Sequence, residues 1–251
     1  MGVSQTKEKD FESLIEKTLV GTSLEERNGL ALNIDDQRPN ANQYYYGAPK
    51  DFDRSLAIDT RRLWSFLYKT QKDELDSYIH QDKVKEDVLK RINDVIATKG
   101  ILEVLHHGIE VKNINLKLFY TLPTATEGET SWDKYNSNEF SVTRQVKYSL
   151  NNENSIDMVI FVNGLPLFTI ELKNPWTNQS ARIDGQNQYK NDRSNKDTIF
   201  NFGRCIAHFT LDQNEVFFTT KLAGANTVFM PFNLGLPNGK GAGNPINENG
   251  Y

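Results

Sequence analysis

Apolar residues recur at helical spacing in three parts of the chain. They predict a first helix over residues 7–20 and two more between about 50 and 100. The first of these two follows an N-cap at Asp59, and the second ends at Lys99-Gly100. Because this helical stretch interrupts an otherwise α/β pattern, we interpret residues 50–100 as an insertion or subdomain.

Strand patterns dominate after residue 110. The predicted elements are a strand over 114–120, a strand over 140–148, a hairpin over 155–173, a helix over about 179–192, and strands around 204–210 and 215–221. Together they predict an α/β domain over residues 1–235, with a central mixed sheet flanked by helices. Residues 236–251 are rich in turn formers and are predicted to be a linker, so we expect the chain to be a fragment of something longer.

The hairpin carries charged residues at its ends. Two apolar runs flank Asn163-Gly164, which predicts a type I′ turn because both central residues of that turn need a positive φ. Asp157 opens the first run, and Glu171 and Lys173 close the second. Such apolar strands belong in a buried sheet, where a charge is costly unless it is paired or binds a metal.

These three charges suit phosphodiester hydrolysis. Side chains alternate along a strand, so Glu171 and Lys173 share a face, and the hairpin returns Asp157 beside them. Two carboxylates can bind Mg²⁺, while a lysine can orient the attacking water and stabilise charge that develops on a phosphate. The alternative is a surface hairpin whose charges form a structural ion pair.

Composition and charge limit the classes of protein to which the chain can belong. The chain has 251 residues and a net charge of −4, which argues mildly against a free-standing DNA-binding protein but allows a nuclease that gains affinity from its partners. No apolar run could cross a bilayer, and the N-terminus lacks the apolar core of a signal peptide. The single cysteine, Cys205, excludes an internal disulfide and is expected to be an inert core thiol. These features predict a cytoplasmic protein.

The pattern of Asp157, a spacer and Glu171-x-Lys173 resembles the PD-(D/E)xK nuclease motif, with Ile156 at its proline position. The sequence around this hairpin is similar to the nuclease core of the R (restriction) subunit of type I restriction–modification enzymes. Further segments that resemble this family are Arg54–Asp59, Gly100–Gly108 and Phe217–Gly224.

The resemblance implies a restriction-endonuclease-like fold and Mg²⁺-dependent cleavage of double-stranded DNA. Asp157 and Glu171 match the metal-binding acids, and Lys173 matches the catalytic lysine. The implied partners are the methyltransferase (M) and specificity (S) subunits. ATP would serve only a translocase that is absent here, since the chain has no phosphate-binding motif.

Further site residues follow from the same resemblance. An acid on the first helix often completes the metal site, and Glu12, then Glu16, is the candidate. The family's Gln-x-x-x-Tyr motif maps to Tyr189, although Gly185 stands where glutamine is expected. Further candidates for DNA contacts are Gln188, with Gln186 as its alternative, Lys190, Arg193 and Arg204. For each, a solvated or packed side chain is the alternative.

Two other functions remain open on sequence alone. One is a non-catalytic docking module of the same complex that keeps the nuclease fold. The other is an unrelated sheet protein whose hairpin charges are structural. Only the nuclease interpretation requires a cation between Asp157 and Glu171.

Overall fold

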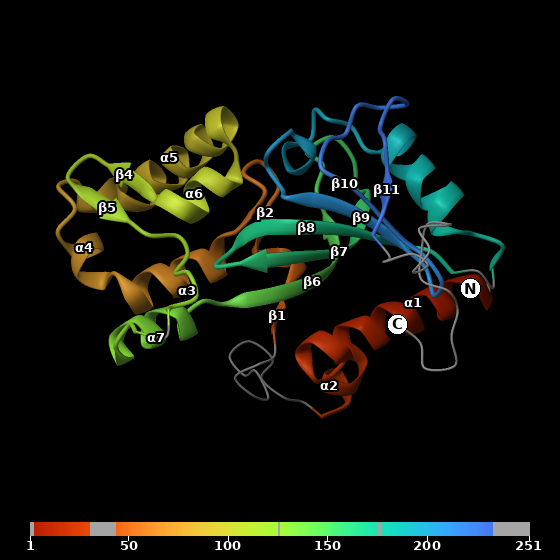
Figure 1. Cartoon of the computed structure of the whole chain (residues 1–251), viewed down its shortest axis with the longest axis horizontal. Coiled ribbons are helices and arrows are strands. Elements are labelled where there is room, and N and C mark those ends of the chain that lie inside the picture. Colours follow the sequence, from red (N-terminus) through yellow and green to blue (C-terminus); the bar gives the residue numbers. More distant parts are fainter. Residues whose placement is uncertain (1–2, 31–43, 125, 175–176, 233–251) are drawn as a thin grey trace.

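The computed structural model describes residues 3–30, 44–124, 126–174 and 177–232. Within these residues, seven strands form one mixed sheet in the order β1-β6-β7-β8-β9-β10-β11, with helices on both faces (Figure 1). The strands are β1 (Tyr45–Gly47), β6 (Phe140–Lys147), β7 (Ser155–Val162), β8 (Leu165–Leu172), β9 (Ala207–Leu211), β10 (Val216–Thr219) and β11 (Met230–Pro231). Pairs β1·β6 and β8·β9 are parallel and the others antiparallel, so the predicted α/β class with a mixed sheet is confirmed.

Different helices cover the two faces of the sheet. Helix α1 (Val3–Val20), which leads into α2 (Leu24–Leu30), packs on one face through a core that includes Val142, Ile170 and Leu172. The opposite face is covered by one helical stretch, formed by the π-helical turns η4 (Ala181–Gly185) and η5 (Gln188–Asp192) with two α-helical residues between them. The short turn η6 (Thr198–Phe200) packs into the core on that side.

The predicted helical stretch forms a separate hydrophobic core at one end of the sheet (Figure 1). Its elements are η1 (Pro49–Asp51), β2 (Phe52–Asp53), β3 (Ile58–Asp59), α3 (Thr60–Thr70), α4 (Lys72–Asp76), η2 (Gln81–Lys83), α5 (Val84–Lys99) and α6 (Ile101–His107). Asp59 caps α3, since its side chain accepts a hydrogen bond from the backbone N–H of Arg62. This confirms the predicted helix start.

The strand predicted over residues 114–120 is wrong in its extent and in the sheet to which it belongs. Only β5 (Ile114–Leu116) forms, and it pairs with β4 (Ile109–Val111) in a small sheet apart from the central one. The alternation of apolar and polar residues continues beyond β5 in the sequence because Leu118 is also buried. Leu118 packs in the helical core but is not part of a strand. The apolar pattern does not indicate β1 or α7 (Glu129–Asn136), and the predicted linker 236–251 lies outside the described residues.

The hairpin turn forms as predicted. Asn163 and Gly164 have φ values of 50° and 81°, as a type I′ turn requires. The turn is buried: the Asn163 amide donates to Leu118 O and its Oδ1 accepts from Glu139 N. A Cβ added to Gly164 would lie 2.3 Å from Asp59 O, so the turn fixes the hairpin against the start of α3.

No helix in the described ranges combines the length and the apolar character that a membrane span needs.

We expect Gly164→Ala to destabilise the protein by roughly 2–4 kcal/mol, because the new methyl group meets backbone atoms and the residue keeps a positive φ. Urea denaturation measures this change. Gly128→Ala is the control, since Gly128 has a φ of −75° and no atom near its added Cβ. The control should change stability by less than about 1 kcal/mol. Equal effects of both substitutions would contradict this account of the turn.

Candidate active site

The candidate site lies where β7 and β8 separate. The last recorded pair of their ladder at this end is Met158 with Ile170. Beyond it, Asp157 Oδ2 accepts a hydrogen bond of 2.8 Å from the backbone N–H of Leu172. Leu172 lies between Glu171 and Lys173, so the hairpin brings Asp157 beside both of them, as side-chain alternation predicts.

Glu171 is fully buried, and its two carboxylate oxygens differ. Oε1 accepts hydrogen bonds from Arg193 Nε at 2.9 Å and Nη2 at 2.6 Å. Oε2 is buried and has no hydrogen-bond partner within the part of the chain that the structure describes. Burial first, and then the charge of Asp157, raise the pKa of Glu171 to about 8, against the opposing effects of Arg193 and Lys173. Burial therefore disfavours the charged form of Glu171, and one buried oxygen of its carboxylate remains available to a cation.

Arg193 acts as an internal counter-ion in this structure. Besides Glu171, its guanidinium donates from Nη1 to the Tyr148 hydroxyl and from Nη2 to Ser155 O, both at 2.9 Å. The side chain is 7% exposed. The structure thus commits Arg193, which the sequence suggests as a phosphate contact, to contacts inside the protein.

Glu12 reaches the same site from α1. Its Oε2 accepts from Arg144 Nε and its Oε1 from Gln145 Nε2, both at 2.8 Å. Burial, followed by the charge of Asp157, raises the pKa of Glu12 to about 7. Asp157 therefore lies near both Glu12 and Glu171, since its charge raises the pKa of each.

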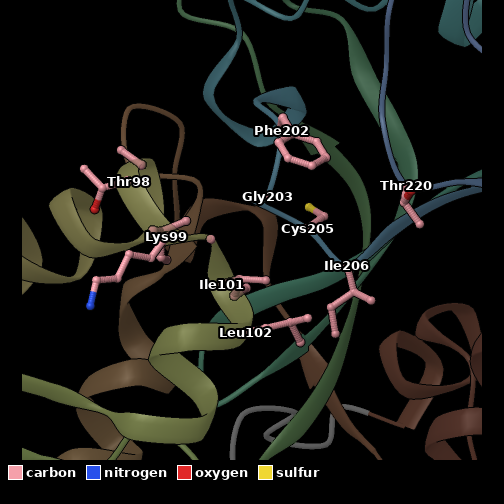
Figure 2. A pocket seen from close by; sticks show the side chains of 12 residues that line it. Thr98, Lys99, Ile101, Leu102, Phe202, Gly203, Cys205, Ile206 and Thr220 are labelled. Atoms are coloured by element: carbon pink, nitrogen blue, oxygen red, sulfur yellow. The ribbon is translucent and has the colours of Figure 1, made fainter.

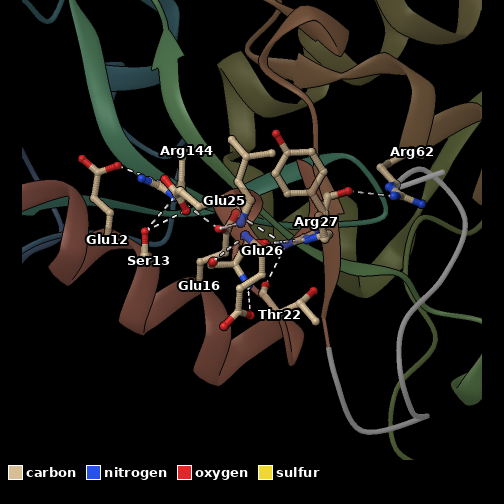
Figure 3. Close-up of polar contacts among 12 residues, drawn as sticks. Glu12, Ser13, Glu16, Thr22, Glu25, Glu26, Arg27, Arg62 and Arg144 are labelled. Atoms are coloured by element: carbon tan, nitrogen blue, oxygen red, sulfur yellow. Dashed lines mark hydrogen bonds and ion pairs between the residues drawn. The ribbon is translucent and has the colours of Figure 1, made fainter. Parts of the chain in front are cut away.

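Glu16 has a different position one helical turn later. Its Oε2 accepts from Leu24 N at 2.6 Å and from Arg144 Nη1 at 3.2 Å. Figure 3 shows Glu16 among the residues that join α1 to α2, whereas Glu12 meets the other edge of Arg144. Of the two acids, Glu12 is therefore the one that the structure places at the strand ends.

The fit to a metal ion depends on Asp157 and Glu171. Among the described residues, no group of three or more His, Cys, Asp or Glu side chains is arranged to hold a metal ion. The ion pairs of Glu12 with Arg144 and of Glu171 with Arg193 account for this, since each turns a carboxylate toward a guanidinium. The unpartnered Oε2 of Glu171 and the adjacent carboxylate of Asp157 still fit a hard cation that takes oxygen ligands.

Tyr189 lies beneath the site and not on its surface. It is fully buried, and its hydroxyl is 2.8 Å from Thr169 Oγ1, which in turn lies 2.7 Å from His208 Nδ1. In this structure Tyr189 does not present its ring to a DNA base. Its network supports the strand that carries Glu171.

The packing of the helical stretch that carries Tyr189 explains why Gly185 stands where a glutamine is expected. A Cβ on Gly185 would lie 1.7 Å from Thr210 Oγ1, so a glutamine cannot occupy this position while Thr210 keeps its place. Thr210 is the strand neighbour of Glu171, and its hydroxyl has no hydrogen-bond partner in the described ranges. The departure from the family's motif therefore coincides with a threonine that fills the space beside Glu171.

The other predicted DNA contacts are spread around the site. Gln188 and Lys190 are half-buried on η5, and Gln188 lines a polar hollow together with Ser155 and Arg193. Arg204 lies apart from the site: it is 2% exposed and donates to Asn93 on α5, and burial lowers its pKa to about 10. The structure does not bring Arg204 to the three charges of the hairpin.

A second hollow lies away from the charged residues of the hairpin. A cavity of about 460 Å³ lies between the α5–α6 junction and residues 202–206 (Figure 2). No Asp, Glu or His lines it. It contains Cys205, which is buried in the core as predicted, and burial raises the pKa of its thiol to about 12.

Arg144 and Gln145 belong to the site but were missed by sequence analysis. Both lie inside a predicted strand, where polar residues are expected simply to face solvent. Their partner Glu12 is more than 130 residues away in the chain, at a separation of 132 from Arg144 and 133 from Gln145. No local pattern signals such a contact.

The raised pKa of Glu12 predicts a pH-dependent stability. The folded protein holds this proton up to about pH 7, whereas the unfolded chain releases it near pH 4.5. The stability that Glu12 contributes is therefore complete below about pH 4.5 and is lost as the pH rises to about 7. Between these limits, the free energy of unfolding of the wild type should fall relative to Glu12→Gln by on the order of 1–3 kcal/mol.

Urea denaturation at a series of pH values measures this difference. Glu86→Gln, at an exposed position on α5, is the matched control and should follow the wild type at every pH. A constant difference between the wild type and Glu12→Gln would show that Glu12 does not titrate in this range.

A comparison with protein families finds a match over much of the chain. A family model described as type I restriction enzyme R protein N terminus matches residues 55–227, more than half of the 251 residues. No curated protein matches the chain. The matched range includes Asp157, Glu171 and Lys173, whereas Glu12 on α1 precedes it. The chain belongs to the family of the N-terminal region of type I restriction enzyme R proteins.

Proposed function

We propose that this chain hydrolyses phosphodiester bonds of double-stranded DNA with Mg²⁺ as cofactor, as the nuclease part of a type I restriction R subunit. The observation that carries the proposal is the buried Oε2 of Glu171, which has no hydrogen-bond partner among the described residues, in a carboxylate on which the charges of Asp157 and Lys173 act. A buried carboxylate oxygen without a partner is costly, and a bound cation would satisfy it.

The two acids would hold the ion from a rigid frame. Asp157 is fixed through its Oδ2 by the N–H of Leu172, and Glu171 is fixed through its Oε1 by Arg193. A bound Mg²⁺ would supply positive charge at the scissile phosphate and favour ionisation of the attacking water. Glu12 would add a third carboxylate if its contact with Arg144 rearranged.

Lys173 would stabilise the charge that develops on the phosphate oxygens. Its side chain is 7% exposed, and its charge acts on the Glu171 carboxylate. Its backbone N–H donates to Leu211 O at 2.9 Å, so the pairing of β8 with β9 sets its position. A preorganised ammonium group of this kind stabilises a transition state more than a mobile surface lysine does.

The proposed partners are DNA and the M and S subunits of the complex. The net charge of −4 gives this chain little electrostatic attraction for a duplex, so partner subunits would supply most of the affinity. Reading of the DNA sequence would belong to the specificity subunit, and ATP would be used by the motor part of the R subunit.

One observation favours the rival function, a non-catalytic docking module. Arg144 and Arg193 already pair with Glu12 and Glu171, as expected of acids that only stabilise the fold. The two functions differ in their need for a cation, because only the nuclease requires an ion at Asp157 and Glu171.

Substitution of the three charged residues should abolish cleavage. We expect Asp157→Asn, Glu171→Gln and Lys173→Ala each to lower the rate of DNA cleavage by at least about 100-fold in the R subunit assembled with its M and S partners. ATP hydrolysis by the motor should persist in each variant. The cleavage rate of plasmid DNA and the ATPase rate, measured on the same preparations, test this.

Two exposed positions on α5 provide matched controls. Asp94→Asn and Lys90→Ala make the same charge changes away from the site and should leave the cleavage rate unchanged. Cleavage at the wild-type rate by all three site variants would reject the nuclease function and favour the docking module.

A further inference from the structure

Strands β6 and β7 are distorted at one position, where Gln145 stands opposite Asp157. The pairs on either side, Arg144 with Met158 and Val146 with Ile156, keep the same register, but no pair is recorded between them. Gln145 has a φ of 51°, in the left-handed region that a residue with a Cβ rarely adopts. The surroundings must hold this residue in an unfavourable conformation.

At this position, the side chains of both strands change the face of the sheet to which they point. Residues two apart in a strand normally share a face, yet Met158 belongs to the core beneath α1 and Ile156 to the core on the opposite face. On β6, Arg144 contacts Glu12 of α1, whereas Val146 lies in the opposite core. The consequence is that neighbouring residues, Arg144 and Gln145, both reach Glu12.

The side chain of Gln145 bridges the two acids. Its Nε2 donates to Glu12 Oε1 at 2.8 Å and, in a longer contact of 3.5 Å, to Asp157 Oδ1. Its Oε1 accepts from the hydroxyl of Ser155 at 2.8 Å. An ionised carboxylate only accepts hydrogen bonds, so the NH₂ group of the amide is the end that faces the two acids when both are ionised.

We propose that Gln145 is a positioning residue that holds the carboxylates of Glu12 and Asp157 together as one cation site. The amide suits this purpose because it donates to both acids and adds no positive charge to the one that Arg144 already places on Glu12. The inference rests on the proposed function, since it assigns Gln145 to the same metal site. It goes further because it assigns to Gln145 the placement of Glu12, on α1, relative to Asp157.

The test is the affinity of this chain for Mn²⁺, followed by electron paramagnetic resonance of the free ion. Groups that orient metal ligands typically contribute 10- to 100-fold in affinity. We therefore expect Gln145→Ala to bind Mn²⁺ about 10- to 100-fold more weakly than the wild type. Gln213→Ala, at an exposed turn position, is the matched control and should bind as the wild type does.

A glycine variant separates positioning from a merely structural role. Gln145→Gly removes the amide but tolerates a positive φ, so its resistance to urea should equal or exceed that of the wild type. We expect its Mn²⁺ affinity to fall as far as that of Gln145→Ala. A stable glycine variant with wild-type Mn²⁺ affinity would overturn the inference.

Asp157→Asn distinguishes failure of this inference from failure of the proposed function. If Asp157→Asn loses Mn²⁺ while both Gln145 variants keep wild-type affinity, the metal site stands and Gln145 does not position it. If the wild type binds no Mn²⁺, or if Asp157→Asn binds it as tightly as the wild type, the metal site itself is rejected and the inference with it.

Discussion

The burial of two carboxylates, Glu12 and Glu171, is the constraint on which the rest of the structure depends. Removing a charge from water costs several kcal/mol unless a partner compensates it. Arg144 compensates Glu12 and thereby ties α1 to β6, and Arg193 compensates Glu171 and ties the end of η5 to β8. The helices on the two faces of the sheet are thus fixed to it by ion pairs that converge near Asp157, in addition to their apolar contacts.

The same ion pairs set the conditions for a cation. Arg193 donates twice to one oxygen of Glu171 and leaves the other without a partner, so an ion could be accommodated without breaking the pair. Arg144, in contrast, contacts Glu12, Glu16 and Glu25 and links the site to the junction of α1 and α2 (Figure 3). A shift of α1 relative to the sheet would therefore change the charge near Asp157, which makes the N-terminal helix part of the site's electrostatics.

The sequence predicts the features that depend on local pattern. The type I′ turn at Asn163-Gly164, the shared face of Glu171 and Lys173 and the helical stretch around α5 follow from residue spacing and turn chemistry, and the structure contains them. The roles of Arg193 and Tyr189 did not follow, because a basic or aromatic residue near a motif looks the same whether it faces solvent or core. Burial decides between these, and it is set by packing between elements that are distant in sequence.

The distortion at Gln145 and Asp157 shows why the site lies where the regular pairing of the strands is interrupted. In a complete ladder the backbone groups of β6, β7 and β8 would pair with one another, and their side chains would alternate strictly. Here a carboxylate oxygen of Asp157 accepts the N–H of Leu172, and an amide side chain spans the gap in the ladder between β6 and β7. Side chains have replaced backbone pairing, so groups from β6, β7, β8 and α1 can face one point. A regular sheet would direct the neighbouring residues Arg144 and Gln145 to opposite faces, so the two could not both reach Glu12.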